Sequence, residues 1–316
     1  MATHDAGVPL PRADPGQLAA DIALLREGGY LKLAVPVRLG GAGRNLRQVA
    51  CAQRRLAARA PAAAFAVNAH HAWIGAAADT LASGGPADPV AGWLLREAAQ
   101  GALIAGWPGP ATGTARDLGE LEALAGDPPG WDWAGTPVTD DSRAGRPARG
   151  YAFTRRPGSP GPVPAMPPGR PGDALIAGMF SWALPLAGMT WYATGRRAFG
   201  QAVRQAQPQR DGGGRPVGRW DETGHPLDQW PVTEAALRLD GIRAQLDRVI
   251  GRWQQRIAAG GAITSLDPGG QWLIRLFTVR YAAADGVRRV IDLAGQITEQ
   301  AREQAGPVGP LPGRAG

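Results

Sequence analysis

The sequence predicts a mainly α-helical fold in which a reduced β segment separates a helical N-terminal part from a C-terminal helical bundle. Through the first hundred residues, apolar side chains recur at the 3.6-residue spacing of amphipathic helices. Residues 174–193 form a run of twenty without a charge, which is typical of a helix buried on all sides in a bundle. Between Pro157 and Gly172, eleven of sixteen residues are Pro or Gly, so no regular element is expected there.

Helices are expected on both sides of this Pro/Gly-rich stretch. The first has Leu18, Ile22 and Leu25 at helical spacing, and the second opens at Asn45, a residue suited to cap a helix N-terminus. The expected helical ranges are 17–27, 45–59, 62–83, 90–100, 174–206, 232–259 and 270–304. The chain therefore divides into a helical N-terminal domain (1–102), a truncated β-domain with a Pro/Gly-rich linker (103–172), a helical bundle (173–304) and a flexible tail (305–316).

Short strand-like pieces occupy the middle of the chain: ALIAGW (102–107), WDWAG (131–135) and GYAFT (150–154). A further strand-like run, YLKLAVP (30–36), leads into the glycine-rich LGGAGRN (39–45). This phrase lacks the G-x-G-x-x-G spacing of a dinucleotide-binding loop, and helices rather than a βαβ unit follow it. We expect it to be a tight connecting turn.

The basic composition does not indicate a nucleic-acid partner. Of 34 Lys and Arg residues only Lys32 is lysine, a pattern that indicates a GC-rich coding bias, and the arginines are spread among acids along the helices. A single cysteine, Cys51, excludes an internal disulfide and is expected to be a buried, inert thiol. The N-terminal residues have neither a basic nor an apolar signal region, so we expect a cytoplasmic protein.

The uncharged run 174–193 is long enough to cross a bilayer. Pro185, several Gly and Ala residues and the lack of a second such run in the sequence favour a core helix instead. We therefore expect no membrane partner.

Histidines and aromatic residues supply candidates for a ligand pocket. His70 and His71 are adjacent, so on a helix they point about 100° apart and cannot act together as zinc ligands; no metal site is predicted. Either of them could line a pocket with Asn68, or simply pack in a helix. Among eleven tryptophans, Trp182 could form an aromatic wall with Tyr192, or both could be core.

Four segments in the same order resemble the acyl-CoA dehydrogenase family over about two-thirds of the chain. GYLKLAVPVRLGGAGRNLRQVACAQRRLAARAPAAAFAVNAHHAWIG resembles the start of the family's N-terminal domain, and WLLREAAQGALIAG resembles the helix and strand that open its β-domain. GMFSWALPLAGMTWYATGRRAFGQAV and RYAAADGVRRVIDLAG resemble helices of its C-terminal bundle. The similar subgroup includes monooxygenase-like members.

The resemblance implies a helical domain, a middle β-barrel and a four-helix bundle that forms oligomers, with FAD between barrel and bundle. It also implies dehydrogenation of an acyl thioester, in which a carboxylate removes the α-proton while the flavin takes the β-hydride. The residues that this resemblance assigns to flavin are Thr112, Thr114, Thr154 and Ser159.

The family's catalytic base has no match in this sequence. Residues 174–209, which include one of its two positions, contain no Asp or Glu. Near the other position Glu299 and Glu303 are out of register, and His71 is a further candidate. The β segment is also shortened. The leading hypothesis is a degenerate family member with impaired flavin binding, acting as a pseudoenzyme that forms a homo-oligomer or pairs with an intact homologue. The alternatives are a functional flavin-dependent oxidoreductase, or a flavin-free enzyme that uses the aromatic cleft.

Overall fold

The computed structural model describes residues 14–83, 89–106, 132–140, 148–155, 170–206, 209–210, 216–217, 230–260 and 271–305. Helices dominate these residues, as predicted. The N-terminal domain contains α1 (Pro15–Glu27), α2 (Leu46–Ala57), α3 (Pro61–Ala66), α4 (Asn68–Ala82) and α5 (Pro89–Ala99). Asn45 caps α2 as expected, because its side chain accepts from the Gln48 N–H while the Gln48 side chain accepts from the Asn45 N–H.

Two local predictions in this domain need correction. The helix expected over 62–83 is two helices, because Val67 takes φ −92° and ψ 0° between α3 and α4. The run expected to be strand-like, YLKLAVP (30–36), forms no strand: it begins with a short 3₁₀ turn, η1 (Tyr30–Lys32), and a second one, η2 (Val37–Leu39), follows it. The cause is backbone geometry: Gly29 and Gly40 adopt left-handed conformations with φ of 70° and 83° and turn the chain. LGGAGRN is the predicted tight turn.

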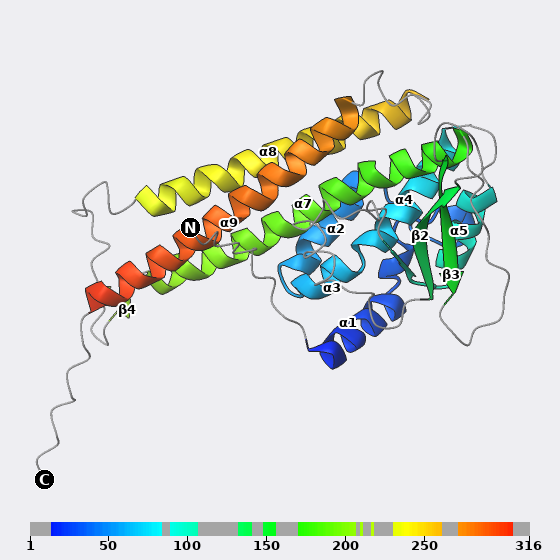
Figure 1. The fold of residues 1–316 in the computed structure, drawn as a ribbon. Coiled ribbons are helices and arrows are strands. Elements are labelled where there is room, and N and C mark those ends of the chain that lie inside the picture. Colours follow the sequence, from blue (N-terminus) through cyan, green and yellow to red (C-terminus); the bar gives the residue numbers. More distant parts are fainter. Residues whose placement is uncertain are drawn as a thin grey trace, which may run out of the picture.

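The strand-like pieces of the middle segment form a small sheet. β1 (Ile104–Ala105) pairs in parallel with β2 (Trp133–Asp140), which pairs antiparallel with β3 (Ala148–Arg155). Figure 1 shows β2 and β3 beside α5, at the end of the molecule where α7 begins. A separate two-stranded ladder, β4 (Gln209–Arg210) with β5 (Pro216–Val217), lies between the helices expected over 174–206 and 232–259.

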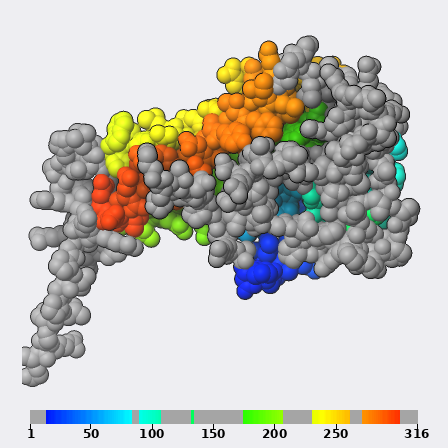
Figure 2. All heavy atoms as spheres, in the orientation of Figure 1, coloured from blue at the N-terminus to red at the C-terminus, as the bar shows by residue number. Residues whose placement is uncertain are grey.

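Three long helices make up the C-terminal bundle: α7 (Arg170–Ala206), α8 (Trp230–Ala258) and α9 (Gln271–Ala305). They run alongside one another (Figure 1), and α9 forms the surface of the bundle on the face drawn in Figure 2. α7 is central, since it contacts α2, α3, α4, α8 and α9. Residues Ala174–Ala206 are long and apolar enough to cross a membrane, but 89% of the most apolar window is buried inside the protein. That burial is typical of a core helix.

One hydrophobic core joins the N-terminal domain to the bundle. It contains residues of α2, α4, α5, β1, α7, α8 and α9. The contact between α4 and α7 is close, because a Cβ atom built on Gly75 would lie 2.1 Å from the Trp182 ring. A Cβ atom built on Gly178 would likewise lie 3.1 Å from the Cβ atom of Ala76. Glycine at 75 therefore permits the indole of α7 to lie directly on α4.

Candidate functional site

The polar interior of the described residues is concentrated on α4. This helix carries three residues predicted from the sequence, Asn68, His70 and His71, and all three are buried. It also carries Asp79, about two turns beyond His71 and half-buried at the contact with α7. The helix thus places neutral polar groups near its N-terminal end and one carboxylate near its C-terminal end.

His70 links the loop after α1 to the first strand. Its Nε2 lies 2.7 Å from the Leu31 carbonyl oxygen, and the Ile104 N–H donates to its Nδ1 at 3.1 Å. Because Nδ1 accepts, we assign the proton to Nε2, which donates to the carbonyl. Burial lowers the pKa of His70 to about 4. Both ring nitrogens are therefore used by the backbone, and the imidazole is neutral at physiological pH.

His71 and Asn68 leave polar atoms without partners. Neither ring nitrogen of His71 has a hydrogen-bond partner among the described residues, and the ring meets Tyr30 edge-on at 5.1 Å between centroids. Burial and the neighbouring His70 lower its pKa well below the usual value. The Asn68 amide donates to the Ala183 carbonyl at 3.3 Å, while its Oδ1 is buried without a partner in the described part of the chain. Two orphaned groups thus lie one turn apart on α4.

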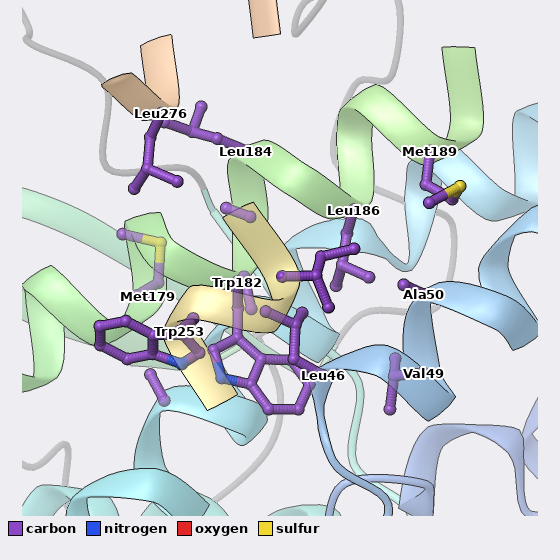
Figure 3. Packing of buried hydrophobic residues seen from close by; sticks show 14 of the residues in the cluster. Leu46, Val49, Ala50, Met179, Trp182, Leu184, Leu186, Met189, Trp253 and Leu276 are labelled. Carbon is purple, nitrogen blue, oxygen red and sulfur yellow. The ribbon is translucent and has the colours of Figure 1, made fainter. Parts of the chain in front are cut away.

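Asp79 binds two tryptophans from the bundle, and a third tryptophan stacks on one of these. Its Oδ2 accepts from Nε1 of Trp182 on α7 at 2.7 Å and from Nε1 of Trp253 on α8 at 2.8 Å. Figure 3 shows these two indoles next to each other with their nitrogen atoms facing. Trp272 of α9 stacks on Trp253 with centroids 5.9 Å apart and donates to the Ser181 hydroxyl at 2.9 Å. One carboxylate oxygen therefore connects α4 to two helices of the bundle.

The charge of Asp79 has no counter-ion among the described residues. Burial raises the pKa of its carboxyl to about 6, and the hydrogen bonds from Trp182 and Trp253 only partly offset this. Its second oxygen, Oδ1, makes no hydrogen bond to a described residue and is not sealed from solvent. A carboxylate with a pKa near neutrality and one free oxygen can accept a proton or a hydrogen bond.

Sequence reasoning missed Asp79. A signal was present, since Asp79 is the only Asp, Glu, Lys or Arg in the helix expected over 62–83. A single carboxylate in a run of small apolar residues is costly to bury unless it is paired or hydrogen-bonded. The two indole donors come from residues 103 and 174 positions away, so the partners were not predictable from local spacing.

The two aromatic residues predicted to share a wall are apart. Trp182 and Tyr192 are ten residues apart on α7, which places their Cα atoms about 15 Å apart along the helix axis. The Trp182 indole is held by Asp79, whereas the Tyr192 ring lies under the guanidinium of Arg243, 6.0 Å from the ring centroid. Their role in a pocket stays a prediction.

The predicted carboxylates of α9 lie at the far end of the bundle. Glu299 lines an open groove of about 550 Å³ with Gln201, Gln205 and Thr298. Because Glu299 is 28 residues beyond the start of α9, it lies about 40 Å along the axis from the end of α9 near the sheet (Figure 1). The side chain of Glu303 lies outside the described residues.

The residues that the resemblance assigns to flavin are largely outside the described part of the chain. Thr112, Thr114 and Ser159 are not described; Thr154 is on β3, opposite Ala134 of β2, and its side chain is not described. The buried orphan atoms of His71 and Asn68 are enclosed within the helices. The described residues therefore do not test these flavin assignments. Nor do any three His, Cys, Asp or Glu side chains among them gather as metal ligands.

No family model and no curated protein matches the chain; solved structures do. It resembles methanesulfinate monooxygenase MsuC from Pseudomonas fluorescens, with 15% identity and a TM-score of 0.62 over 92% of this chain and 87% of that one. It also resembles the prolyl acyl carrier protein oxidase AnaB, with 15% identity and a TM-score of 0.53 over 89% and 88%. The chain also resembles TdsC from Paenibacillus sp. A11-2 in complex with FMN and indole, with 14% identity and a TM-score of 0.55 over 91% of this chain and 80% of that one. Identities this low show the fold alone, and that fold is the mainly α, acyl-CoA dehydrogenase-like one predicted from the sequence.

Proposed function

We propose that this chain is a degenerate acyl-CoA dehydrogenase-like protein with impaired flavin binding, acting as a pseudoenzyme or as a subunit of a heteromer. The observation that carries the proposal is the position of the carboxylates. The central helix α7 has none from Ala174 to Ala206, and Glu299 of α9 lines an open groove at the far end of the bundle. A base for α-proton removal must lie within hydrogen-bond reach of the acidic carbon, and neither of the expected positions supplies one.

The helical body is well packed in spite of this loss. The core continues from the N-terminal helices through α7 into α8 and α9, so the fold remains stable without its original reaction. A bundle of this kind can still present its outer helices to a second copy or to an intact homologue.

Flavin binding is the first test. Purified protein is expected to show no absorbance near 450 nm and to bind neither FAD nor FMN in a fluorescence titration. FMN is included because it is the flavin bound in the TdsC structure. A stoichiometric flavin in the purified protein would contradict the proposal. Light scattering after size exclusion, with and without a co-expressed homologue, separates a homo-oligomer from a heteromer.

Asp79 favours a second candidate function, a flavin-dependent oxidoreductase of the monooxygenase or dehydrogenase type. A carboxyl with a pKa of about 6 and a free Oδ1 is suited to act as a proton acceptor near neutral pH. In that case Asp79→Asn, which keeps an oxygen for both indoles, abolishes turnover in a flavin-reconstituted sample while the melting temperature is not lowered. If neither the wild type nor Asp79→Asn binds flavin or shows turnover, the pseudoenzyme is favoured.

A further inference from the structure

One half of the outer bundle carries arginines without acids. From residue 248 to residue 284, every described Asp, Glu, Lys or Arg on α8 and α9 is an arginine: Arg248, Arg252, Arg256, Arg275 and Arg280. In an antiparallel pair of helices this stretch is the end at which α8 finishes and α9 begins. Among the described residues of α8 and α9, positive charge is therefore segregated at that end.

The other half of the same two helices is ion-paired. Glu234 binds Arg238 at 2.8 Å and Arg289 at 3.0 Å, and Arg243 binds Asp247 at 2.9 Å. In contrast, Arg248, Arg252 and Arg275 have no acidic partner among the described residues. Arg256 and Arg280 do make other contacts and are left aside. We call Arg248, Arg252 and Arg275 the arginine face.

The three arginines lie on two helices that pack against each other, α8 and α9. Arg248 and Arg252 lie one turn apart on α8. Arg248 and Arg275 of the neighbouring α9 lower the pKa of Arg252 by like-charge repulsion. Such repulsion is relieved when an anion lies between the groups.

The same part of α9 exposes large apolar side chains. Ile274 is 63% exposed and Tyr281 is 51% exposed, and in Figure 2 this stretch of α9 lies on the outer surface. Arg and Tyr are enriched where proteins contact proteins, especially at residues that contribute most to affinity. A surface with exposed apolar groups beside unpaired arginines fits an interface better than it fits a solvated helix face.

We propose that the arginine face is a docking surface for an acidic protein surface. Charge complementarity carries this choice of occupant. Three guanidinium groups are few for nucleic acid, which is commonly held by six or more phosphate contacts, and few for an anionic membrane, which attracts clusters of about four to eight basic residues. The inference rests on the proposed subunit role and names its partner as an acidic protein.

The test uses poly-L-glutamate as the acidic probe and the full chain. Binding is followed by fluorescence anisotropy at 50 and 300 mM NaCl, comparing the wild type with R248E/R252E/R275E. We expect at least tenfold weaker binding of the variant at low salt, and a smaller difference at high salt because the charges are screened. The matched control is R55E/R59E/R204E, which changes the net charge equally at exposed arginines elsewhere.

The control decides whether the effect belongs to the face. Retained binding by R55E/R59E/R204E supports the proposal, and an equal loss in both variants overturns it. The proposal also fails if the wild type does not bind poly-L-glutamate. It fails equally if a 20-base-pair DNA or a phosphatidylserine vesicle binds more tightly with the same dependence on the arginine face. Discovery of a bound flavin would overturn the pseudoenzyme proposal but would leave these affinities as they are.

Discussion

The two ends of α4 solve the problem of burying polar groups in opposite ways. At the N-terminal end His70 and His71 are buried as neutral rings, because desolvation lowers their pKa values. At the C-terminal end Asp79 is half-buried, as a carboxyl whose pKa desolvation raises to about 6. Both shifts have the same physical cause, the cost of removing a charge from water, and the comparison shows that their consequences for stability have opposite signs.

The signs follow from proton binding in the folded and unfolded states. For His70 the unfolded chain binds a proton at about 6.5 and the folded chain only at about 4, so stability is lost as pH falls through that window. For Asp79 the folded chain binds a proton at about 6 and the unfolded chain at about 3.8, so stability is gained as pH falls through nearly the same window. One helix thus carries two opposing pH dependences that partly cancel between about pH 4 and 6.

The largest effect is expected for Asp79→Leu. Leucine leaves the indole N–H groups of Trp182 and Trp253 without an acceptor in a buried contact. Each unsatisfied buried group costs about 1–3 kcal/mol, so we expect a loss of about 4 kcal/mol. Urea unfolding followed by tryptophan fluorescence measures this loss. The control is Asp79→Asn, which retains an acceptor oxygen; a similar loss in both variants would show that the two hydrogen bonds contribute little.

Replacing His70 by alanine is expected to cost about 3 kcal/mol. The change leaves the Leu31 carbonyl and the Ile104 N–H unpaired and creates a cavity. Hydrogen exchange of the Ile104 amide gives a local measurement, and its protection should fall with the global stability. Unaltered protection would mean that another group satisfies this amide.

Asp79→Asn is expected to change the pH profile more than the stability at pH 5. Asparagine carries no charge, so at pH 8 the variant should exceed the wild type by about 2 kcal/mol, and the two should converge only below about pH 4. With the opposing carboxyl removed, the loss of stability below pH 6 caused by the histidines becomes steeper. Melting temperatures from about pH 3.5 to pH 8 measure both features. Parallel profiles would rule out titration of Asp79 in this range.

The smallest effect is expected for His71→Leu. Because neither ring nitrogen of His71 has a partner among the described residues, leucine removes two desolvated polar atoms and no hydrogen bond. We expect a stability change within about 1 kcal/mol of zero at pH 7, and less destabilisation on acidification than in the wild type. A large loss at pH 7 would indicate that the ring nitrogens have a bound water or ligand.

The fold was largely predictable because its signals are local. Helical spacing and the Asn45 cap gave the positions of most helices, and the three strand-like pieces of the middle segment became β1, β2 and β3. The break at Val67 and the turns at Gly29 and Gly40 depend on single backbone conformations that helical or strand spacing does not reveal.

The site was less predictable because its contacts are distant in sequence. Asn68 and His71 were named from their local phrase, yet their orphaned atoms emerge only from the packing around α4. The hydrogen-bond donors of Asp79, Trp182 and Trp253, lie on two other helices. Spacing along one helix cannot show which residue will lie opposite a buried carboxylate.

The single core that runs from α2 and α4 into the bundle has a consequence for how the protein unfolds. Gly75 allows the Trp182 ring to lie against α4, and Asp79 links this helix to α8. The N-terminal helices and the bundle therefore depend on the same close contacts. In calorimetric terms they should behave as one cooperative unit, with a single transition whose van't Hoff and calorimetric enthalpies agree. A chain whose sequence predicts separate helical domains would then unfold in one thermal transition.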